Sequence, residues 1–390
     1  MEVTVVNETR DARLAALGFD LGRQRLAREY KRRRIPLAAI RIVAYIAISV
    51  WLLQGFTFQV KAWASPFGGG IPQVALYTVI VYFLYWLPVI PLGVYGGLVL
   101  ERRYGMSVQG LRSWLADAAK SLAIGLGFAV LTVEVLYFLL AATPDLWWLY
   151  AWALGMLVGL ALTWIGPVVL APLFYKFEPL TDEALAARLK ELAARAGAKV
   201  VGAFRMVASA KTTRAIGGLA GMGRTRRIIL SDTLLNRYTT DEVESVIAHE
   251  LAHHVNRDMA RLMAGGTVVT LVGLLAVDQI LRAAIVPIGL AGMDDVAGLP
   301  MIGLAVAATS TLLGPFVNIL SRRREAKADA FALRMTGNPE AFRSTMVRIH
   351  DQNLGVADPH PIVEFLFHDH PSGRRRVATV QARGESESLL

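Results

Sequence analysis

The stretch "ESVIAHELAHHVNRDMARLMAGGTVVTLVGLLAVDQI" (residues 244–280) joins two different kinds of segment without a linker. Its first part places three of the chain's seven histidines on a helical pattern, which Thr239 and Glu242 open as a capping box. Its second part belongs to an apolar stretch, 262–290, that is long enough to cross about 30 Å of hydrocarbon. The sequence therefore predicts a histidine-bearing helix that leads directly into a membrane span.

Further apolar stretches of spanning length surround this one. The chain has 390 residues and is 54% hydrophobic, more than is usual for a soluble protein. We expect six spans, at about 36–58, 73–99, 119–141, 147–174, 262–290 and 299–320. Basic residues flank them at 23–34, 101–112 and 321–324, whereas the alternate loops nearly lack Lys and Arg. This asymmetry predicts that both termini and segment 175–260 lie in the cytoplasm.

Charge and composition exclude several classes of protein. The net charge is +10, but the basic residues lie beside apolar stretches as membrane anchors, so we expect no nucleic-acid partner. The chain has no cysteine, which excludes disulfides and thiolate metal sites. The first twenty residues are polar, and no apolar core of a cleaved signal peptide is apparent.

The motif His249-Glu250-Leu251-Ala252-His253 is H-E-x-x-H. Residues i and i+4 share a helix face, so His249 and His253 can converge on one zinc ion, one per chain. Glu250 is placed to take a proton from a water that the metal activates, without being a ligand itself. The alternative is a cytosolic helix with surface histidines. His254 lies off the ligand face and is expected to serve packing or the surface.

A third ligand is needed, because catalytic zinc sites usually have three protein ligands and an open position. The segment "RRREAKADAFAL" (322–333) offers Glu325 and Asp329, again i and i+4, just after the last span. We expect Glu325 to bind the metal and Asp329 to orient a ligating histidine. The alternative is that the two acids form ion pairs with the arginine run 322–324.

These motifs predict a mainly α polytopic membrane bundle with an inserted cytosolic, zincin-like α+β catalytic domain. The expected parts are a cytoplasmic amphipathic basic arm (1–35), a four-span region (36–174), the H-E-x-x-H domain (175–260), a two-span hairpin (261–320) and a cytosolic segment (321–390). Within 175–260 we expect a helix over 181–197 with Thr181 as its cap and Gly197 as its stop. Strands are expected in 198–207 and 226–232.

Together with "HDHPSGRRR" (368–376), these motifs resemble the type I CAAX prenyl protease family over about residues 175–377. The resemblance implies a membrane-embedded zinc endopeptidase that hydrolyses membrane-associated or lipidated (CAAX-type) peptides and proteins. It implies an active site on the cytoplasmic side of a bacterial cytoplasmic membrane, or of the ER membrane in a eukaryote. It also implies that His370 and Arg375 stabilise the oxyanion, with Arg374 or Arg376 in place of Arg375 if the register differs.

The alternative for these residues is a basic tail that contacts lipid phosphates, and His360 and His368 are weaker candidates. Two departures from the family are apparent. Eukaryotic members carry seven spans, whereas we count six. The family's Asn on the strand that lines the substrate cleft corresponds here to Ile216. Ile216, Gly217 and Gly218 are therefore the substrate-strand candidates, and such a strand can still pair with a peptide through main-chain groups.

Two carboxylates lie inside spans, Glu134 and Asp278. A carboxylate in hydrocarbon costs at least about 2.5–3.5 kcal/mol. The resemblance implies a water-filled chamber between the spans, and we predict that both residues line it. The alternative is a protonated carboxyl hydrogen-bonded between helices.

Two other functions remain open. The chain could be a quality-control protease similar to the heat-shock membrane zinc proteases, although those are shorter, with about four spans. It could also be a catalytically silent membrane protein with structural zinc, which the intact Glu250 disfavours.

Overall fold

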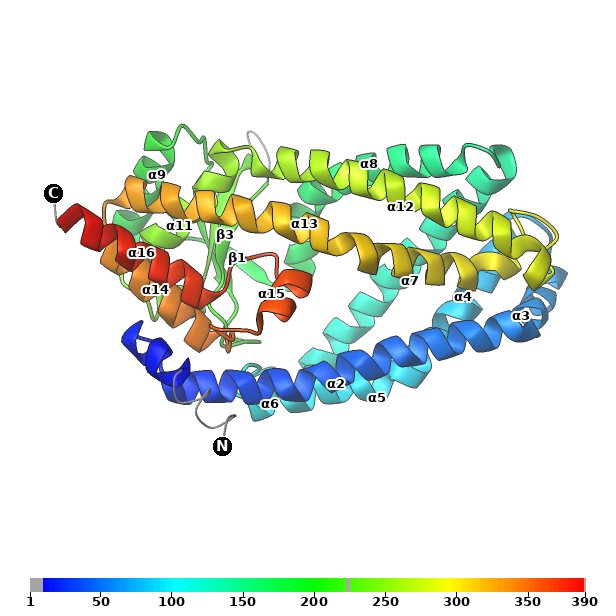
Figure 1. Cartoon of the computed structure of the whole chain (residues 1–390), viewed down its shortest axis with the longest axis horizontal. Helices are drawn as coiled ribbons and strands as arrows, with labels where there is room; N and C mark the ends of the chain where they lie inside the picture. Colours follow the sequence, from blue (N-terminus) through cyan, green and yellow to red (C-terminus); the bar gives the residue numbers. More distant parts are fainter. Residues whose placement is uncertain (1–9, 222–224, 389–390) are drawn as a thin grey trace.

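Long apolar helices form one end of the molecule and a small sheet lies at the other (Figure 1). The computed structural model describes residues 10–221 and 225–388. Within this part, six helical segments are long and apolar enough to cross a membrane. The first described residues and the C-terminal helix both lie at the end with the sheet, as an even number of crossings requires (Figure 1).

Three of the first four crossings, the first, second and fourth, are built from broken helices. Crossing one comprises α2 (Leu21–Trp51), a short π-helical turn and α3 (Thr57–Ala64). Crossing two comprises α4 (Ile71–Trp86), α5 (Ile90–Val94) and α6 (Glu101–Arg103), and proline begins two of its short turns. Crossing three is α7 (Leu111–Ala142), and crossing four begins as α8 (Trp147–Ile165). Neighbouring helices satisfy the backbone groups that such breaks release.

The last two crossings are continuous helices, α12 (Asp258–Ile288) and α13 (Leu299–Thr336). Two of the expected boundaries fall inside helices. The basic arm and the first span form one helix through Pro36, so no break separates them at residue 35. Likewise, α13 passes residue 320 and carries Glu325 on the same rigid element as the last span. The third candidate ligand is therefore positioned by a membrane helix.

The sheet contains four strands in the described residues, in the order β1-β2-β4-β3. They are β1 (Lys176–Pro179), β2 (Ala203–Val207), β3 (Gly217–Ala220) and β4 (Arg227–Ser231). β2 and β4 run parallel, while β1 and β3 pair antiparallel with them. β2 and β4 confirm the expected strands, and the order leaves β3 at an edge.

The helices at this end include α9 (Glu183–Arg195), α10 (Asp232–Leu235), α11 (Thr240–Val255), α14 (Pro339–Gln352), α15 (Pro361–Phe367) and α16 (Gly373–Ser388). A core of apolar side chains joins α9, the sheet, α11 and α14. The predicted capping box of α11 is present. The prediction for the start of α9 is wrong, because Asp182 rather than Thr181 accepts the capping hydrogen bond. Gly197, with φ 71°, ends it as expected.

Candidate metal centre

Helix α11 presents His249 and His253 toward α13. The capping box fixes the start of α11, and most of its length is buried in the core of the sheet end. His249 and His253 lie one turn apart on the face against which α13 packs. Glu325 comes from α13, so the candidate ligands belong to two helices that form part of one core.

The three predicted ligands lie together. One ligand atom from each of His249, His253 and Glu325 lies within 4.8 Å of the others. The two Nε2 atoms are 3.2 Å apart, and the Glu325 oxygens lie 3.3 Å from His249 Nε2 and 3.2 Å from His253 Nε2. Ligands in a tetrahedral zinc site with bonds of about 2.0–2.1 Å are separated by about 3.3–3.4 Å. The spacing of these three side chains therefore fits a zinc ion.

The charges around His249 and Glu325 also suit a metal ion. Burial lowers the pKa of His249, but the facing carboxylates of Asp329 and Glu325 outweigh burial and raise it to about 9. Two facing carboxylates thus favour a positive charge at the imidazole pair. Glu325 Oε2 is a buried oxygen without a hydrogen-bond donor in the described part of the chain. A divalent cation would supply both the charge and the missing partner.

Asp329 fixes the orientation of His249. The Nδ1 atom of His249 lies 2.9 Å from Asp329 Oδ1. A proton on Nδ1 can be donated to Asp329, and the unprotonated Nε2 then faces His253 and Glu325 as a ligand atom. Arg376 in turn donates to Asp329, from Nε at 2.9 Å and from Nη2 at 2.5 Å. Both the Asp329 and the Arg376 side chains are nearly buried, with exposures of 12% and 10%. The pair forms a fixed support behind the first ligand.

His253 has its own support, which the sequence reasoning missed. The Nδ1 atom of His253 lies 3.1 Å from Asp258 Oδ2, and Asp258 is 1% exposed. Asp258 begins α12, and Arg257 before it adopts a left-handed conformation that turns the chain from α11 into the span. The sequence shows only that Asp258 follows His253 by five residues, and the turn at Arg257 that brings the two together is not part of any motif.

Glu250 lies beside the ligands and is not one of the three. Burial is the main cause that raises its pKa above the ordinary value, against the lowering effect of His249 and His253. A raised pKa makes a carboxylate a better acceptor of a proton near neutral pH. Its position and its pKa both suit a general base.

His370 reaches the ligand group from the loop after α15. Its Nε2 atom is 3.3 Å from Glu325 Oε1, and its Nδ1 atom is 2.8 Å from Asp369 Oδ1. Arg375 lies differently, with its side chain 57% exposed and its Nε atom 3.7 Å from Glu364. Arg376 is the arginine that pairs with Asp329 beside the site, which agrees with the alternative register that the sequence left open.

The candidate substrate strand lies next to the same helix. β3 packs against α11, and a Cβ built on Gly218 would lie 3.8 Å from Glu250 Oε2. The Ile216 N–H donates to the Ser231 hydroxyl at 2.9 Å, and the Ile216 carbonyl accepts from the Ser231 N–H at 2.8 Å. Bonded pairs alternate along an antiparallel ladder, so the main chains of Gly217 and Leu219 face the open edge. Of the three predicted residues, only Gly217 offers main-chain groups to a peptide.

The two intramembrane carboxylates have different surroundings. Asp278 is 2% exposed and accepts hydrogen bonds from Trp147 Nε1 at 2.7 Å and Arg282 Nε at 2.9 Å. An indole and a guanidinium therefore contact the carboxylate, and its role as a chamber-lining residue stays a prediction. Glu134 is half-buried on α7, and its Oε1 atom has no hydrogen-bond partner among the described residues. Its role as a chamber-lining residue stays a prediction.

Comparisons with known proteins agree with this geometry. The sequence model of peptidase family M48 matches residues 179–384. A model described as CAAX prenyl protease N-terminal, five membrane helices, matches residues 15–176. The boundary between the two matches falls at β1, where the chain leaves the fourth crossing.

Individual relatives cover most of the chain. An uncharacterized metalloprotease of Bacillus subtilis, YhfN, is 30% identical over 84% of this chain and 78% of its own. A probable CAAX prenyl protease 1 of Schizosaccharomyces pombe is 28% identical over 72% of this chain and 60% of its own. The crystal structure of S. mikatae Ste24p matches with a TM-score of 0.83 at 20% identity, over 93% of this chain and 89% of that one. This match shows the fold.

Proposed function

Because this chain belongs to peptidase family M48 and is an integral-membrane metalloendopeptidase, we propose that its metal is a single zinc ion per chain, held by His249, His253 and Glu325. The observation that carries the proposal is the convergence of the three ligand atoms within 4.8 Å, with Glu250 beside them. Imidazole nitrogens with one carboxylate form a donor set typical of catalytic zinc. The family membership disfavours a silent membrane protein.

In the proposed reaction, zinc supplies Lewis acidity that polarises the peptide carbonyl and lowers the pKa of a water molecule. Glu250 accepts the proton of the attacking water and passes it to the leaving amine. His370 donates a hydrogen bond to the oxyanion as charge develops on the carbonyl oxygen, a contact commonly worth a few kcal/mol. Asp329 and Asp258 keep the two ligating imidazoles in the required tautomer and orientation.

Arg376 takes a supporting role in this proposal, and Arg375 takes none. The Arg376 guanidinium balances the charge of Asp329 and lies 3.4 Å from His249 Nδ1. It therefore acts through the orientation of the first ligand. Arg375, paired with Glu364 and mostly exposed, is free to contact solvent or lipid phosphates.

We propose that the substrate lies extended along the open edge of β3. Gly217 and Leu219 then pair with its main chain, and Gly218, having no side chain, leaves room beside Glu250. The attachment of the site to spans α12 and α13 favours chains held at the membrane. The names of the eukaryotic relatives extend the proposal to prenylated C-terminal peptides.

The proposed location of the active site is the cytoplasmic side of the membrane. Basic segments 23–34, 101–112 and 321–324 all lie at the end of the molecule that carries the sheet. Positive charge marks the cytoplasmic flank of membrane helices. Similarity to the Bacillus subtilis metalloprotease over 84% of the chain supports a bacterial cytoplasmic membrane.

The test uses purified protein in detergent with quenched peptides, farnesylated and unmodified, and the Glu250→Gln variant as its matched control. Wild type should cleave at least one peptide and stop when a chelator is added. Glu250→Gln should retain about one zinc per chain and lose hydrolysis. Undiminished hydrolysis by Glu250→Gln would exclude the mechanism. Equal rates on both peptides would exclude a requirement for the prenyl group.

A further inference from the structure

A clasp of ion pairs and backbone hydrogen bonds joins the membrane crossings to the loop that leads into β3. The loop comprises residues 208–216, between β2 and β3. From it we infer that Asp117 and Glu101, on crossings three and two, are positioning residues for the substrate strand. The inference rests on the proposed function of β3 as the surface that binds the peptide.

The backbone part of the clasp resembles a small piece of sheet. Ser107, in the connection between crossings two and three, forms an antiparallel bridge with Thr212. The N–H of Val108 donates to the Lys211 carbonyl at 3.1 Å, and the N–H of Thr213 donates to the Met106 carbonyl at 3.2 Å. The Thr212 and Thr213 hydroxyls donate to the carbonyls of Met106 and Gly105, at 2.8 and 2.7 Å.

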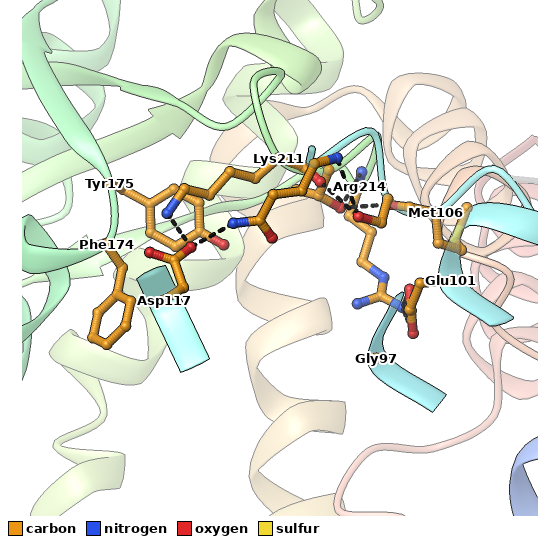
Figure 2. Close-up of a pocket in the computed structure, with 11 residues that line it drawn as sticks. Gly97, Glu101, Met106, Asp117, Phe174, Tyr175, Lys211 and Arg214 are labelled. Atoms are coloured by element: carbon orange, nitrogen blue, oxygen red, sulfur yellow. Dashed lines mark hydrogen bonds and ion pairs between the residues drawn. The ribbon is translucent and has the colours of Figure 1, made fainter. Parts of the chain in front are cut away.

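Two ion pairs flank this bridge (Figure 2). Lys211 Nζ lies 2.5 Å from Asp117 Oδ2 on α7, and the Lys211 ammonium also lies 5.2 Å from the centre of the Tyr175 ring. Arg214 Nη2 lies 2.8 Å from Glu101 Oε2 on α6. The Asp117 and Lys211 side chains are 20% and 19% exposed, so solvent screens this pair less than a surface pair, whereas Arg214, at 36%, is more open to solvent than Glu101, at 11%.

A cavity of about 240 Å³ lies beside the two ion pairs, and the side chains of both pairs contribute to its lining. Its lining includes Gly97, Gln109 and Phe174, so side-chain packing does not fill the space between the loop and the membrane helices. With packing incomplete, the ion pairs and the bridge are what fix the distance between loop and membrane. Loss of one pair should therefore let the loop shift.

The loop transmits its position to β3 over a short distance. Arg214 is two residues before Ile216, whose main chain joins Ser231 on β4. The side chain of Asn353 holds Ala215 in between, accepting from its N–H at 2.9 Å and donating to its carbonyl at 3.1 Å. A shift at Lys211 or Arg214 thus reaches the edge that faces Glu250.

The test is the charge reversal Asp117→Lys and its rescue by the swap Asp117→Lys with Lys211→Asp. We expect the single variant to lose about 10- to 100-fold in kcat/KM, mainly through KM, because misplacement of a binding strand by about 1 Å has effects of this size. Zinc content should stay at the wild-type value. The swap should restore kcat/KM to within about threefold, because it restores an ion pair of the opposite polarity.

A matched control is Lys176→Glu, which breaks the exposed pair with Glu178 on β1, the other edge of the sheet. It should leave kcat/KM unchanged. If Asp117→Lys does not fold, Asp117→Asn replaces it, with the same direction of change. Wild-type kcat/KM in the single variant, or failure of the swap to rescue it, would overturn the inference.

Hydrogen exchange gives a readout that needs no activity. Backbone amides of 216–220 should exchange faster in zinc-loaded Asp117→Lys than in wild type, and at the wild-type rate in the swap. Unchanged exchange would refute the clasp even if no peptide were cleaved. An inactive wild type with the expected exchange pattern would instead overturn the proposed function and leave the clasp standing.

Discussion

Substitutions of Asp329 test two roles of its side chain. It orients the metal ligand His249, and it balances the buried charge of Arg376. Asp329 accepts from His249 Nδ1 at 2.9 Å and from Arg376 Nε at 2.9 Å. Asp329→Asn keeps the shape of the side chain but removes its charge and one acceptor oxygen. Loss of such a support typically lowers metal affinity about 10- to 100-fold, or about 1.4–2.7 kcal/mol.

Asp329→Ala should cost more in folding, because it leaves the Arg376 guanidinium, only 10% exposed, without a counter-charge. Breaking one side of a buried pair destabilises by about 3–5 kcal/mol. The double variant Asp329→Asn with Arg376→Met removes both charges. It should recover much of the stability lost in Asp329→Ala while its zinc affinity stays low.

Two assays measure these effects separately. Competition with chelators of graded affinity gives the zinc Kd, and thermal unfolding of the metal-free protein in detergent gives relative stability. Wild-type zinc affinity in Asp329→Asn would refute the orienting role. Equal melting temperatures for Asp329→Ala and wild type would refute the buried-charge argument.

Three further perturbations follow from the geometry. Gly217→Ala should destabilise the sheet end by about 1–3 kcal/mol, because its Cβ would lie 2.9 Å from Val246 Cγ1; Gly218→Ala, with 3.8 Å to its nearest atom, is the matched control in thermal unfolding. Burial raises the pKa of Glu242, but hydrogen bonds that include one from Arg348 outweigh it and lower the pKa below 4.5. Glu242→Gln should therefore lower the melting temperature at pH 7, and the difference from wild type should disappear as the pH falls through the lowered pKa; a constant difference down to pH 3 would contradict this. Chelation should abolish hydrolysis and added zinc should restore it, whereas full activity after exhaustive dialysis against chelator would rule out a metallopeptidase.

The sequence predicted the parts of this protein that depend on local pattern. Spacing of four residues brought His249 and His253 to one helix face, and apolar stretches indicated the crossings. Glu325 followed from topology, since residues just after the last span return to the side of α11. The capping box of α11 followed from two residues three apart.

The remaining features depend on side-chain directions that spacing does not determine. The three consecutive arginines 374–376 are identical in sequence, but each pairs with a different carboxylate. Arg374 pairs with Asp358 and Arg375 with Glu364, and only the fold shows that Arg376 pairs with Asp329. Asp278 has a spacing of four from Arg282, yet the indole of Trp147 that closes its site comes from another crossing. Asp258 contacts His253 only because the chain makes a left-handed turn at Arg257, and no pattern in the sequence predicts that turn.

The most direct test of the account is an anomalous difference map recorded above and below the zinc absorption edge, on crystals of the purified wild-type protein. One peak per chain is expected, bounded by His249, His253 and Glu325, and it should disappear below the edge. No peak there, with the three side chains turned away from one another, would contradict it.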